Sequence, residues 1–384
     1  MDKTGIEAYY VQKDGKKLQF GFTTGTCAAA AAKAATELLL KNAAPRTVSI
    51  RTPKGIELKL PVLEPRAENG AAVCAIRKSS GDDPDVTDGV LVYASVRRCD
   101  VPGVSIDGGI GVGRVTKPGL KQAIGEAAIN PVPRDMIRRA VEEAAADFDG
   151  EGGFSVVISI PEGVALAEKT FNPRLGIEGG ISILGTSGIV EPMSEQALID
   201  SIRLEIRQKR ALGAVRLILT PGNYGANYLR SLCGVGEGEL VKCSNFIGNA
   251  LDMAAEEGYK EVLLVGHVGK LCKLAGGIMN THSKEGDARA ELMAACALRA
   301  GASADTAREI LGCVTTDEML RVARDAGVFD GTVASMGERI AFYLDHRVKG
   351  QFTVGVLVFS NVYGTLCTIG PAADWIAEAG GGQE

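Results

Sequence analysis

The sequence has no long apolar run and no export signal. No stretch of about 18 or more uninterrupted apolar residues occurs in the chain, although a helix needs about that length to cross a membrane. The opening residues MDKTGIEAYYVQKDGKK lack the apolar core of a secretory signal peptide. We therefore expect a cytoplasmic protein with no membrane partner.

Residue patterns that bind metals are also scarce. The three histidines form no HExxH motif and lie in no cysteine cluster, and the nine cysteines include no CxxC pair. Zinc sites in proteins usually show such spacings, and this cysteine pattern suits reduced thiols. No metal held by the protein itself is expected.

An excess of positive charge is absent as well. The formal net charge is -5, which argues against nucleic acid as a partner and means that any site for an anion must be local. The chain has 384 residues, of which 46% are hydrophobic. That is enough for two buried cores and favours two domains.

The order of the expected elements divides the chain near residue 178. Residues 1–178 mix strand-like runs with a few helices, which predicts an α+β domain. From residue 179, strand, glycine-rich turn and helix repeat, which predicts a Rossmann-like α/β domain with a mainly parallel sheet. Residues 286–348 are expected to form extra helices, and residues 352–359 a strand that rejoins the sheet.

Two local patterns are especially clear. Residues 47–52 and 56–60 place apolar side chains at every second position and are joined by Pro53, Lys54 and Gly55, which predicts a hairpin. A helix is expected from Glu195 to Leu212, because apolar residues recur there at a spacing of four.

Residues 20–35, FGFTTGTCAAAAAKAA, combine three threonines and two glycines with an alanine run. Threonine is a good N-cap, and alanine is the best helix former. The unpaired N–H groups at such a helix start favour an anion, for example a carboxylate. The alternative is a capped helix that packs tightly on a sheet and binds nothing.

The longer strings of the chain carry a resemblance to a known family. TTGTCAAAAAKAA is followed in order by GDDPDVTDG, GVGRVTKPGL, INPVPR, TFNPRLGIEGGISILGTSGIVEPMSE, GNYG, KCSNFIGN and GHVGKL. In this order they resemble the cobalt-precorrin-5B C(1)-methyltransferase family, over roughly residues 20 to 290. The resemblance implies transfer of a methyl group from S-adenosylmethionine to ring carbon 1 of a cobalt-containing tetrapyrrole, giving cobalt-precorrin-6A in anaerobic cobalamin biosynthesis.

The resemblance also implies where cobalt and partners come from. Cobalt would enter with the tetrapyrrole substrate, and transient contact with neighbouring pathway enzymes is a further expectation. The oligomeric state is left open. The first domain is expected to bind the substrate and the second to bind S-adenosylmethionine.

The donor site can be predicted from the physics of open α/β sheets, which bind ligands beyond the carboxyl ends of their strands. Three glycine-rich turns qualify, at residues 185–193, 220–225 and 266–270, although each could be only a tight connection. The expected cofactor-binding residues are Gly185, Thr186, Ser187, Gly188, Glu191, Thr220, Gly222, Asn223, Gly266 and His267.

Two further readings concern the donor site and its chemistry. Asp107, Gly109, Gly111 and Gly113 match the D-x-G-x-G-x-G of Rossmann-type methyltransferases, but the following VTKPGL interrupts the helix that this motif requires. His267 is the one candidate catalytic residue, as a hydrogen-bonding or proton-accepting group.

The substrate carboxylates need donors, and basic residues inside the quoted strings can supply them. The acidic loop GDDPDVTDG could also contact the substrate, although Asx-turn chemistry explains it without a ligand. The expected substrate-binding residues are Thr23, Thr24, Gly25, Thr26, Asp85, Lys117, Arg134, Arg174 and Lys270.

Two other function classes compete with the enzyme. A non-catalytic tetrapyrrole carrier is suggested by the lack of an unmistakable catalytic residue. A nicotinamide-dependent reductase ranks below it, because no G-x-G-x-x-G follows a strand.

Overall fold

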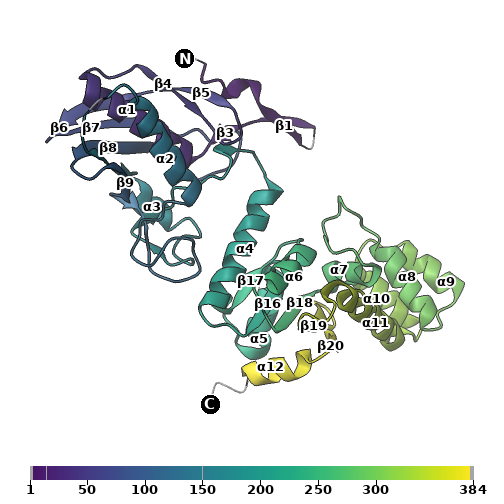
Figure 1. Cartoon of the computed structure of the whole chain (residues 1–384). Coiled ribbons are helices and arrows are strands. Elements are labelled where there is room, and N and C mark those ends of the chain that lie inside the picture. The colour runs from purple at the N-terminus through teal and green to yellow at the C-terminus, as the bar shows by residue number, and fades with distance from the viewer. Residues whose placement is uncertain (1–2, 14, 149, 381–384) are drawn as a thin grey trace. The chain divides into compact units, whose positions relative to one another are not determined.

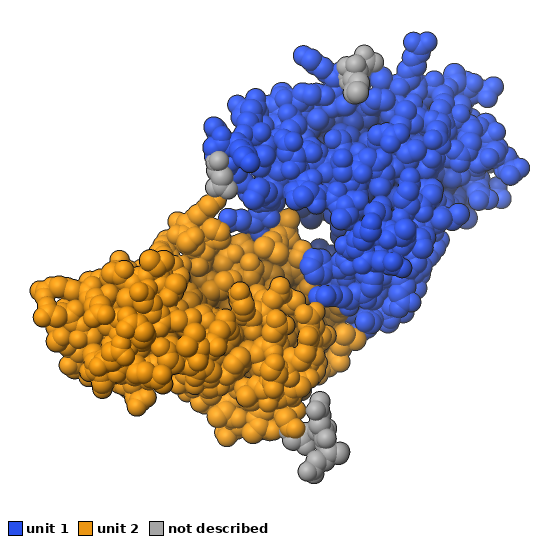
Figure 2. Space-filling model, turned by 180° about the vertical axis from the view of Figure 1, so that it is seen from behind, with its two compact units in different colours: residues 1–195 blue, residues 196–384 orange. Residues whose placement is uncertain are grey.

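The structure is a computed structural model that describes residues 3–13, 15–148 and 150–380. The chain forms two compact units, Met1–Glu195 and Gln196–Glu384, which are coloured separately in Figure 2. This boundary differs from the predicted one after residue 178. Residues 180–190 belong with unit 1 because they pair with its strands, at Gly180–Ile181 and Ile189–Val190.

Unit 1 is a mixed α and β structure. Its elements are η1 (Ile6–Ala8), β1 (Tyr10–Lys13), β2 (Lys16–Gln19), β3 (Gly21–Phe22), α1 (Thr24–Lys41), β4 (Thr47–Arg51), β5 (Glu57–Pro61), β6 (Leu63–Glu68), β7 (Ala71–Arg77), β8 (Leu91–Cys99), β9 (Gly103–Gly108), β10 (Gly111–Val112), β11 (Arg114–Val115), α2 (Pro131–Ala144), β12 (Gly153–Ser159), α3 (Gly163–Ala167), β13 (Ile177–Glu178), β14 (Gly180–Ile181) and β15 (Ile189–Val190).

The core of unit 1 lies between a five-stranded sheet and two helices. The strand order is β6-β7-β8-β12-β9, antiparallel except for the parallel pair β12 and β9. Helices α1 and α2 lie together on this sheet (Figure 1). The alanine run of α1 is fully buried, and its small side chains allow close approach to the strands.

Unit 2 alternates strands with helices and has a helical region before its last two strands. Its elements are α4 (Glu195–Ala211), β16 (Arg216–Thr220), α5 (Asn223–Cys233), η2 (Glu237–Glu239), β17 (Leu240–Lys242), α6 (Ile247–Glu256), β18 (Glu261–His267), α7 (Val268–Leu271), η3 (Cys272–Gly276), α8 (Arg289–Arg299), α9 (Ala304–Leu311), α10 (Thr316–Asp325), α11 (Phe329–Val348), β19 (Thr353–Ser360), β20 (Gly364–Ile369) and α12 (Ala372–Gly380).

The sheet of unit 2 has the order β17-β16-β18-β19-β20, with the first four strands parallel and β20 antiparallel. Apolar side chains fill both faces. One face packs Leu263 and Phe359 against α5 and α12, and the other packs Leu217 and Val356 against α4, α6 and α11. Figure 1 shows α8, α9, α10 and α11 gathered beside the sheet.

Several predicted elements are confirmed. The hairpin is β4 and β5, paired antiparallel from Thr47 with Pro61 to Arg51 with Glu57. The helix expected from Glu195 is α4, and the late strand is β19, which pairs with β18 in the second sheet. The structure thus supports the coarse prediction of mixed α and β units with C-terminal helices. No helix within the described residues is long and apolar enough to cross a membrane.

Candidate functional site

The start of α1 is closed by the chain's own backbone. Thr23 caps the helix by accepting a hydrogen bond from Thr26 N, and Gly25 N donates to Leu184 O at 3.0 Å. The Thr26 hydroxyl donates to Gly188 O at 2.7 Å. All four residues from Thr23 to Thr26 are buried. The N–H groups of Gly25 and Thr26 are therefore already used, which removes the physical reason to expect a substrate carboxylate there.

The turn at residues 185–191 lies against this helix start. A side chain at Gly185 would collide with Thr23, and one at Gly188 would collide with Thr26 and Thr52. Lys54 forms an ion pair with Glu191. The turn belongs to unit 1 and follows no strand of the second sheet. Gly185, Thr186, Ser187, Gly188 and Glu191 thus belong to unit 1 and the other five predicted cofactor residues to unit 2, so the three turns do not follow strands of one sheet.

Two of the remaining substrate candidates have structural partners in unit 1. Arg134 uses its guanidinium on three backbone carbonyls, those of Ile106, Ala127 and Ile129. Asp85 accepts from the buried Lys78 at 2.8 Å and from Thr87, and these contacts lower its pKa against the effect of burial. The Asx-turn reading of this acidic loop is the one that the contacts support.

The other two basic candidates of unit 1 are less enclosed. Lys117 is half-buried, and its side chain covers Gly176. Arg174 is exposed, with its guanidinium 5.8 Å from the centre of the Phe171 ring. Neither residue lines the one pocket described in unit 1.

In unit 2, the strand order reverses between β16 and β18. After β16 the chain passes to β17 on one side, and it returns to β18 on the other. A crevice at such a reversal, outside the carboxyl ends of the strands, is the usual ligand site of open parallel sheets. Thr220 ends β16 and His267 ends β18. The two predicted turns that begin there, at residues 220–225 and 266–270, do meet.

Thr220 leaves a polar atom without a partner at this edge. The residue is fully buried, and its Oγ1 has no hydrogen-bond partner among the described residues. Such an atom carries a desolvation cost of about 1–3 kcal/mol unless a further group binds it. Thr281 Oγ1 is buried without a partner in the same way, so such an atom marks an unsatisfied polar position and does not by itself identify a ligand site.

The start of α5 differs from that of α1 in being open. Gly222 takes the positive φ of 118° that precedes the helix, and no side chain caps it. In the described chain, no acceptor contacts the N–H groups of Asn223, Tyr224 and Gly225. Asn223 and Tyr224 are exposed. The free N–H groups and the positive end of the helix dipole can receive an anionic group.

Gly225 lets the open start approach the sheet. A Cβ there would lie 2.6 Å from Val265 O and 3.0 Å from the Thr220 Cβ. Lys270 lies at the same edge, and its Nζ donates to Pro221 O at 2.7 Å. Burial lowers the pKa of Lys270. Its ammonium holds the loop before α5 and adds positive charge to this edge.

His267 is held in its neutral form. Gly269 N donates to its Nδ1 at 3.0 Å, and Asn361 N approaches its Nε2 at 3.4 Å. A neutral imidazole accepts at one nitrogen and carries a proton on the other, whereas an imidazolium carries a proton on both. The 3.0 Å hydrogen bond from Gly269 N to Nδ1 therefore fits the neutral tautomer that is protonated on Nε2. Burial also lowers the pKa of His267, and Asp317 only partly opposes this. Nδ1 thus has a structural hydrogen bond, and the catalytic role of His267 stays a prediction.

Sequence reasoning missed several residues of this edge. The Tyr224 and Phe359 rings flank His267, with ring centres 6.3 and 5.5 Å away. Ser360 donates to Asp317 at 2.6 Å, and Asn361 follows it. Tyr224 lies in the GNYG string and could have been found there. The position of Asp317, on α10, depends on the tertiary structure.

No group of three or more His, Cys, Asp and Glu side chains that could hold a metal ion occurs in the described part of the chain. The polar groups at the edge are instead hydroxyl, amide, imidazole and ammonium groups. They suit an organic ligand with hydroxyl and carboxylate groups.

These features define a class of two-unit protein with a candidate ligand site at the strand reversal of its second unit. Family models narrow the class: the CbiD model matches residues 11–192, and the model of the CbiD C-terminal domain matches residues 280–368. The chain belongs to the CbiD family.

Curated relatives agree along nearly the whole chain. A cobalt-precorrin-5B C(1)-methyltransferase from Ruminiclostridium cellulolyticum is 47% identical, with 92% of each chain covered. A protein of the same name from Alkaliphilus metalliredigens is 44% identical, with 93% of this chain and 94% of the relative covered. A Listeria monocytogenes protein of that name is 39% identical over 93% of this chain and 95% of its own.

A solved structure is also similar in sequence. It is the 1.9 Å crystal structure of the cobalamin biosynthesis protein (cbiD) from Archaeoglobus fulgidus, which is 30% identical. The alignment covers 74% of this chain and 88% of that one, with a TM-score of 0.40. The family assignment depends on the sequence relatives and not on this likeness.

Proposed function

We propose that this protein transfers a methyl group from S-adenosylmethionine to ring carbon 1 of cobalt-precorrin-5B in anaerobic cobalamin biosynthesis, forming cobalt-precorrin-6A. The supporting observation is the 47% identity to a relative with that activity in its name, over 92% of both chains. The motif strings of the sequence predict the family to which this relative belongs. Cobalt belongs to the substrate in this scheme, not to the protein.

The second part of the proposal places the methyl donor in unit 2, treated as a Rossmann-like domain. The order β17-β16-β18, with parallel pairing, supports a ligand at the carboxyl ends of β16 and β18. The free hydroxyl of Thr220 and the N–H groups of Asn223 and Tyr224 match the ribose hydroxyls and carboxylate of such a donor. Gly185 to Gly188 belong to unit 1 and follow no strand of this sheet.

The chemistry makes modest demands on the chain. S-adenosylmethionine supplies a methyl group that is already activated on a sulfonium centre. The residues at the edge then have to bind, orient and exclude water, which are the main protein contributions to a direct displacement. Tyr224, as an exposed aromatic ring beside His267, covers one side of the site. His267 stays neutral and adds no charge beside a cationic donor.

Product analysis tests the reaction. Purified protein is incubated anaerobically with cobalt-precorrin-5B and S-adenosylmethionine carrying a labelled methyl group. We expect a product with one additional labelled methyl on ring carbon 1 and formation of S-adenosylhomocysteine. Intact substrate recovered without label would contradict the enzyme. A protein that binds the tetrapyrrole but does not bind S-adenosylhomocysteine would instead be the non-catalytic tetrapyrrole carrier.

A Thr220→Val substitution tests the donor site. Valine keeps the shape and removes the hydroxyl that has no partner within the described chain. We expect affinity for S-adenosylhomocysteine to fall about tenfold, the loss of one hydrogen bond, with stability unchanged or raised. The matched control is Thr332→Val, which removes an equally buried hydroxyl on α11. Equal affinities of the two variants for S-adenosylhomocysteine would contradict a donor site at Thr220.

A further inference from the structure

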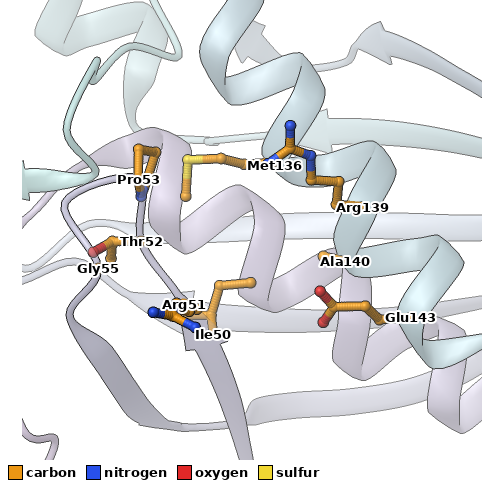
Figure 3. Close-up of a pocket in the computed structure, with 9 residues that line it drawn as sticks. All are labelled: Ile50, Arg51, Thr52, Pro53, Gly55, Met136, Arg139, Ala140 and Glu143. Carbon is orange, nitrogen blue, oxygen red and sulfur yellow. The ribbon is translucent and has the colours of Figure 1, made fainter.

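Unit 1 contains a pocket of about 340 Å³ between the β4–β5 hairpin and helix α2. Figure 3 shows Ile50 and Arg51 on the hairpin side, and Met136, Arg139 and Glu143 on the side of α2. Ile50 and Met136 are buried, with 5% and 7% of their surfaces exposed. The pocket therefore has an apolar floor and a charged rim.

The local sequence places the arginines at this rim. Strand β4 alternates buried and exposed residues, so Val48 and Ile50 face the core and Arg51 faces outward. On α2, Met136 and Ala140 are one turn apart and buried, while Arg139 is exposed beside them. Both arginines thus stand next to apolar surface without being enclosed by it.

The rim has a net positive charge in an acidic protein. Glu143 is already paired with Lys33, at 2.8 Å. Arg51 and Arg139 have no hydrogen-bond or ion-pair partner from their side chains among the residues that the structure describes. The chain as a whole carries a net charge of -5. Arg51 and Arg139 therefore place positive charge at separate points around one pocket, which an anionic ligand needs on a predominantly negative protein.

The chemistry of the rim points to carboxylates. Guanidinium groups bind carboxylates through two parallel hydrogen bonds. The volume lies at the lower end of the roughly 300–1,000 Å³ typical of ligand pockets. That space fits peripheral carboxylate arms and the edge of a ring, but not a whole tetrapyrrole macrocycle.

We propose that this pocket binds peripheral acetate and propionate groups of the tetrapyrrole substrate, with Arg51 and Arg139 as the carboxylate-binding residues. The identity of the ligand rests on the function proposed above. Glu143 and its partner Lys33 limit the positive charge. In this assignment the pocket takes over the role that sequence reasoning gave to Thr23, Thr24, Gly25 and Thr26.

The test measures substrate binding apart from methyl transfer. Cobalt-precorrin-5B is titrated anaerobically into the full-length protein without donor, and binding is followed by its visible absorption. We expect Arg51→Gln and Arg139→Gln each to raise Kd about tenfold or more, and the double variant to raise it further. The matched control is Arg138→Gln, because Arg138 is exposed on the same helix but pairs with Asp135.

Two further readouts separate a binding role from damage to the fold. Affinity for S-adenosylhomocysteine should stay within about twofold in all these variants. Glu143→Gln should leave substrate affinity unchanged or tighten it, since it removes a negative charge from the rim. An unchanged substrate Kd in the double variant, or equal losses with Arg138→Gln, would overturn the pocket assignment.

The same experiment distinguishes this pocket from the proposed reaction. Arginine-dependent binding of cobalt-precorrin-5B by a protein that transfers no methyl group would support the pocket and contradict the enzyme. Methyl transfer with the same KM for cobalt-precorrin-5B in the parent and in both arginine variants would support the enzyme and contradict the pocket.

Discussion

The starts of α1 and α5 are built from similar residues but differ in what their polar groups contact. Helix α1 follows β3 after the single residue Thr23, and α5 follows β16, which ends at Thr220, after Pro221 and Gly222. At α1, Gly25 N and the Thr26 hydroxyl are bound to Leu184 O and Gly188 O. At α5, the Thr220 hydroxyl has no partner in the described chain. Similar residue types therefore hold two backbone segments together in unit 1 and form a candidate ligand site in unit 2.

The difference comes from what covers each helix start. A segment about 160 residues further along the chain returns to α1 and supplies carbonyl acceptors. At α5, the neighbouring strand end contributes His267, and Lys270 contributes an ammonium. Carbonyl oxygens satisfy N–H groups and exclude an anion, whereas an ammonium group attracts one. The covering segment decides whether a helix start can bind a ligand.

The largest expected effects come from glycine to alanine changes at the two starts. A Cβ would lie 2.6 Å from Val265 O at residue 225, and 2.8 Å from Pro133 Cγ at residue 25. We expect Gly225→Ala and Gly25→Ala each to lower the free energy of unfolding by about 1–3 kcal/mol. Only Gly225→Ala should also weaken S-adenosylhomocysteine binding, by about tenfold or more.

Calorimetric titration and chemical denaturation of the full-length variants would measure both quantities. Loss of S-adenosylhomocysteine binding in Gly25→Ala, with Gly225→Ala unaffected, would reverse the comparison between the two starts.

Threonine to valine changes sharpen the contrast. Thr26 donates to Gly188 O at 2.7 Å, and Thr24 accepts from Leu184 N at 3.0 Å. Each substitution leaves a backbone group without its partner, so we expect a loss of about 1–2 kcal/mol of stability and no change in donor affinity. Thr220→Val should do the opposite. Equal stability losses at Thr26 and Thr220, measured by denaturation, would show that both hydroxyls have structural roles.

The smallest effect is a pH dependence at the open start. Because burial lowers the pKa of His267 from its ordinary 6.5, the unfolded chain takes up a proton there before the folded one does. This contribution to stability is present above about pH 6.5 and is lost as the pH falls below it. His267→Asn, which can still cap α7, should lose less stability than the parent between pH 7 and pH 5.

Denaturation curves at several pH values would check this difference. His282→Asn and His346→Asn are the control substitutions. A His267→Asn variant with the same pH slope as the parent would mean that His267 is free to become protonated.

The family and much of the fold could be predicted from the sequence because both depend on local or ordered patterns. The β4–β5 hairpin follows from alternation and a Pro-Lys-Gly turn, and α4 from apolar residues spaced by four. The turns at Thr220 and Gly266 could be found because glycine and small residues after an apolar strand are a local signal. These two turns meet because β16 and β18 are parallel neighbours, so that their carboxyl ends lie at the same edge of the sheet.

The remaining site residues could not be assigned in this way. Arg134 resembles a carboxylate-binding residue in sequence, but three backbone carbonyls engage its guanidinium. Arg51 and Arg139 look like surface residues, and only the packing of α2 beside the hairpin brings them to one pocket. Hydrogen-bond partners and cavity walls come from distant segments, which spacing along the chain does not reveal.

The sequence by itself thus determined the family, the β4–β5 hairpin, helix α4 and the late strand β19. The tertiary structure decided which polar groups remain free. It closed the start of α1 with residues 184–188 and left Thr220 without a partner in the described chain. The reason is physical: secondary structure follows short-range periodicity, whereas the satisfaction of a buried polar group depends on whichever segment folds against it.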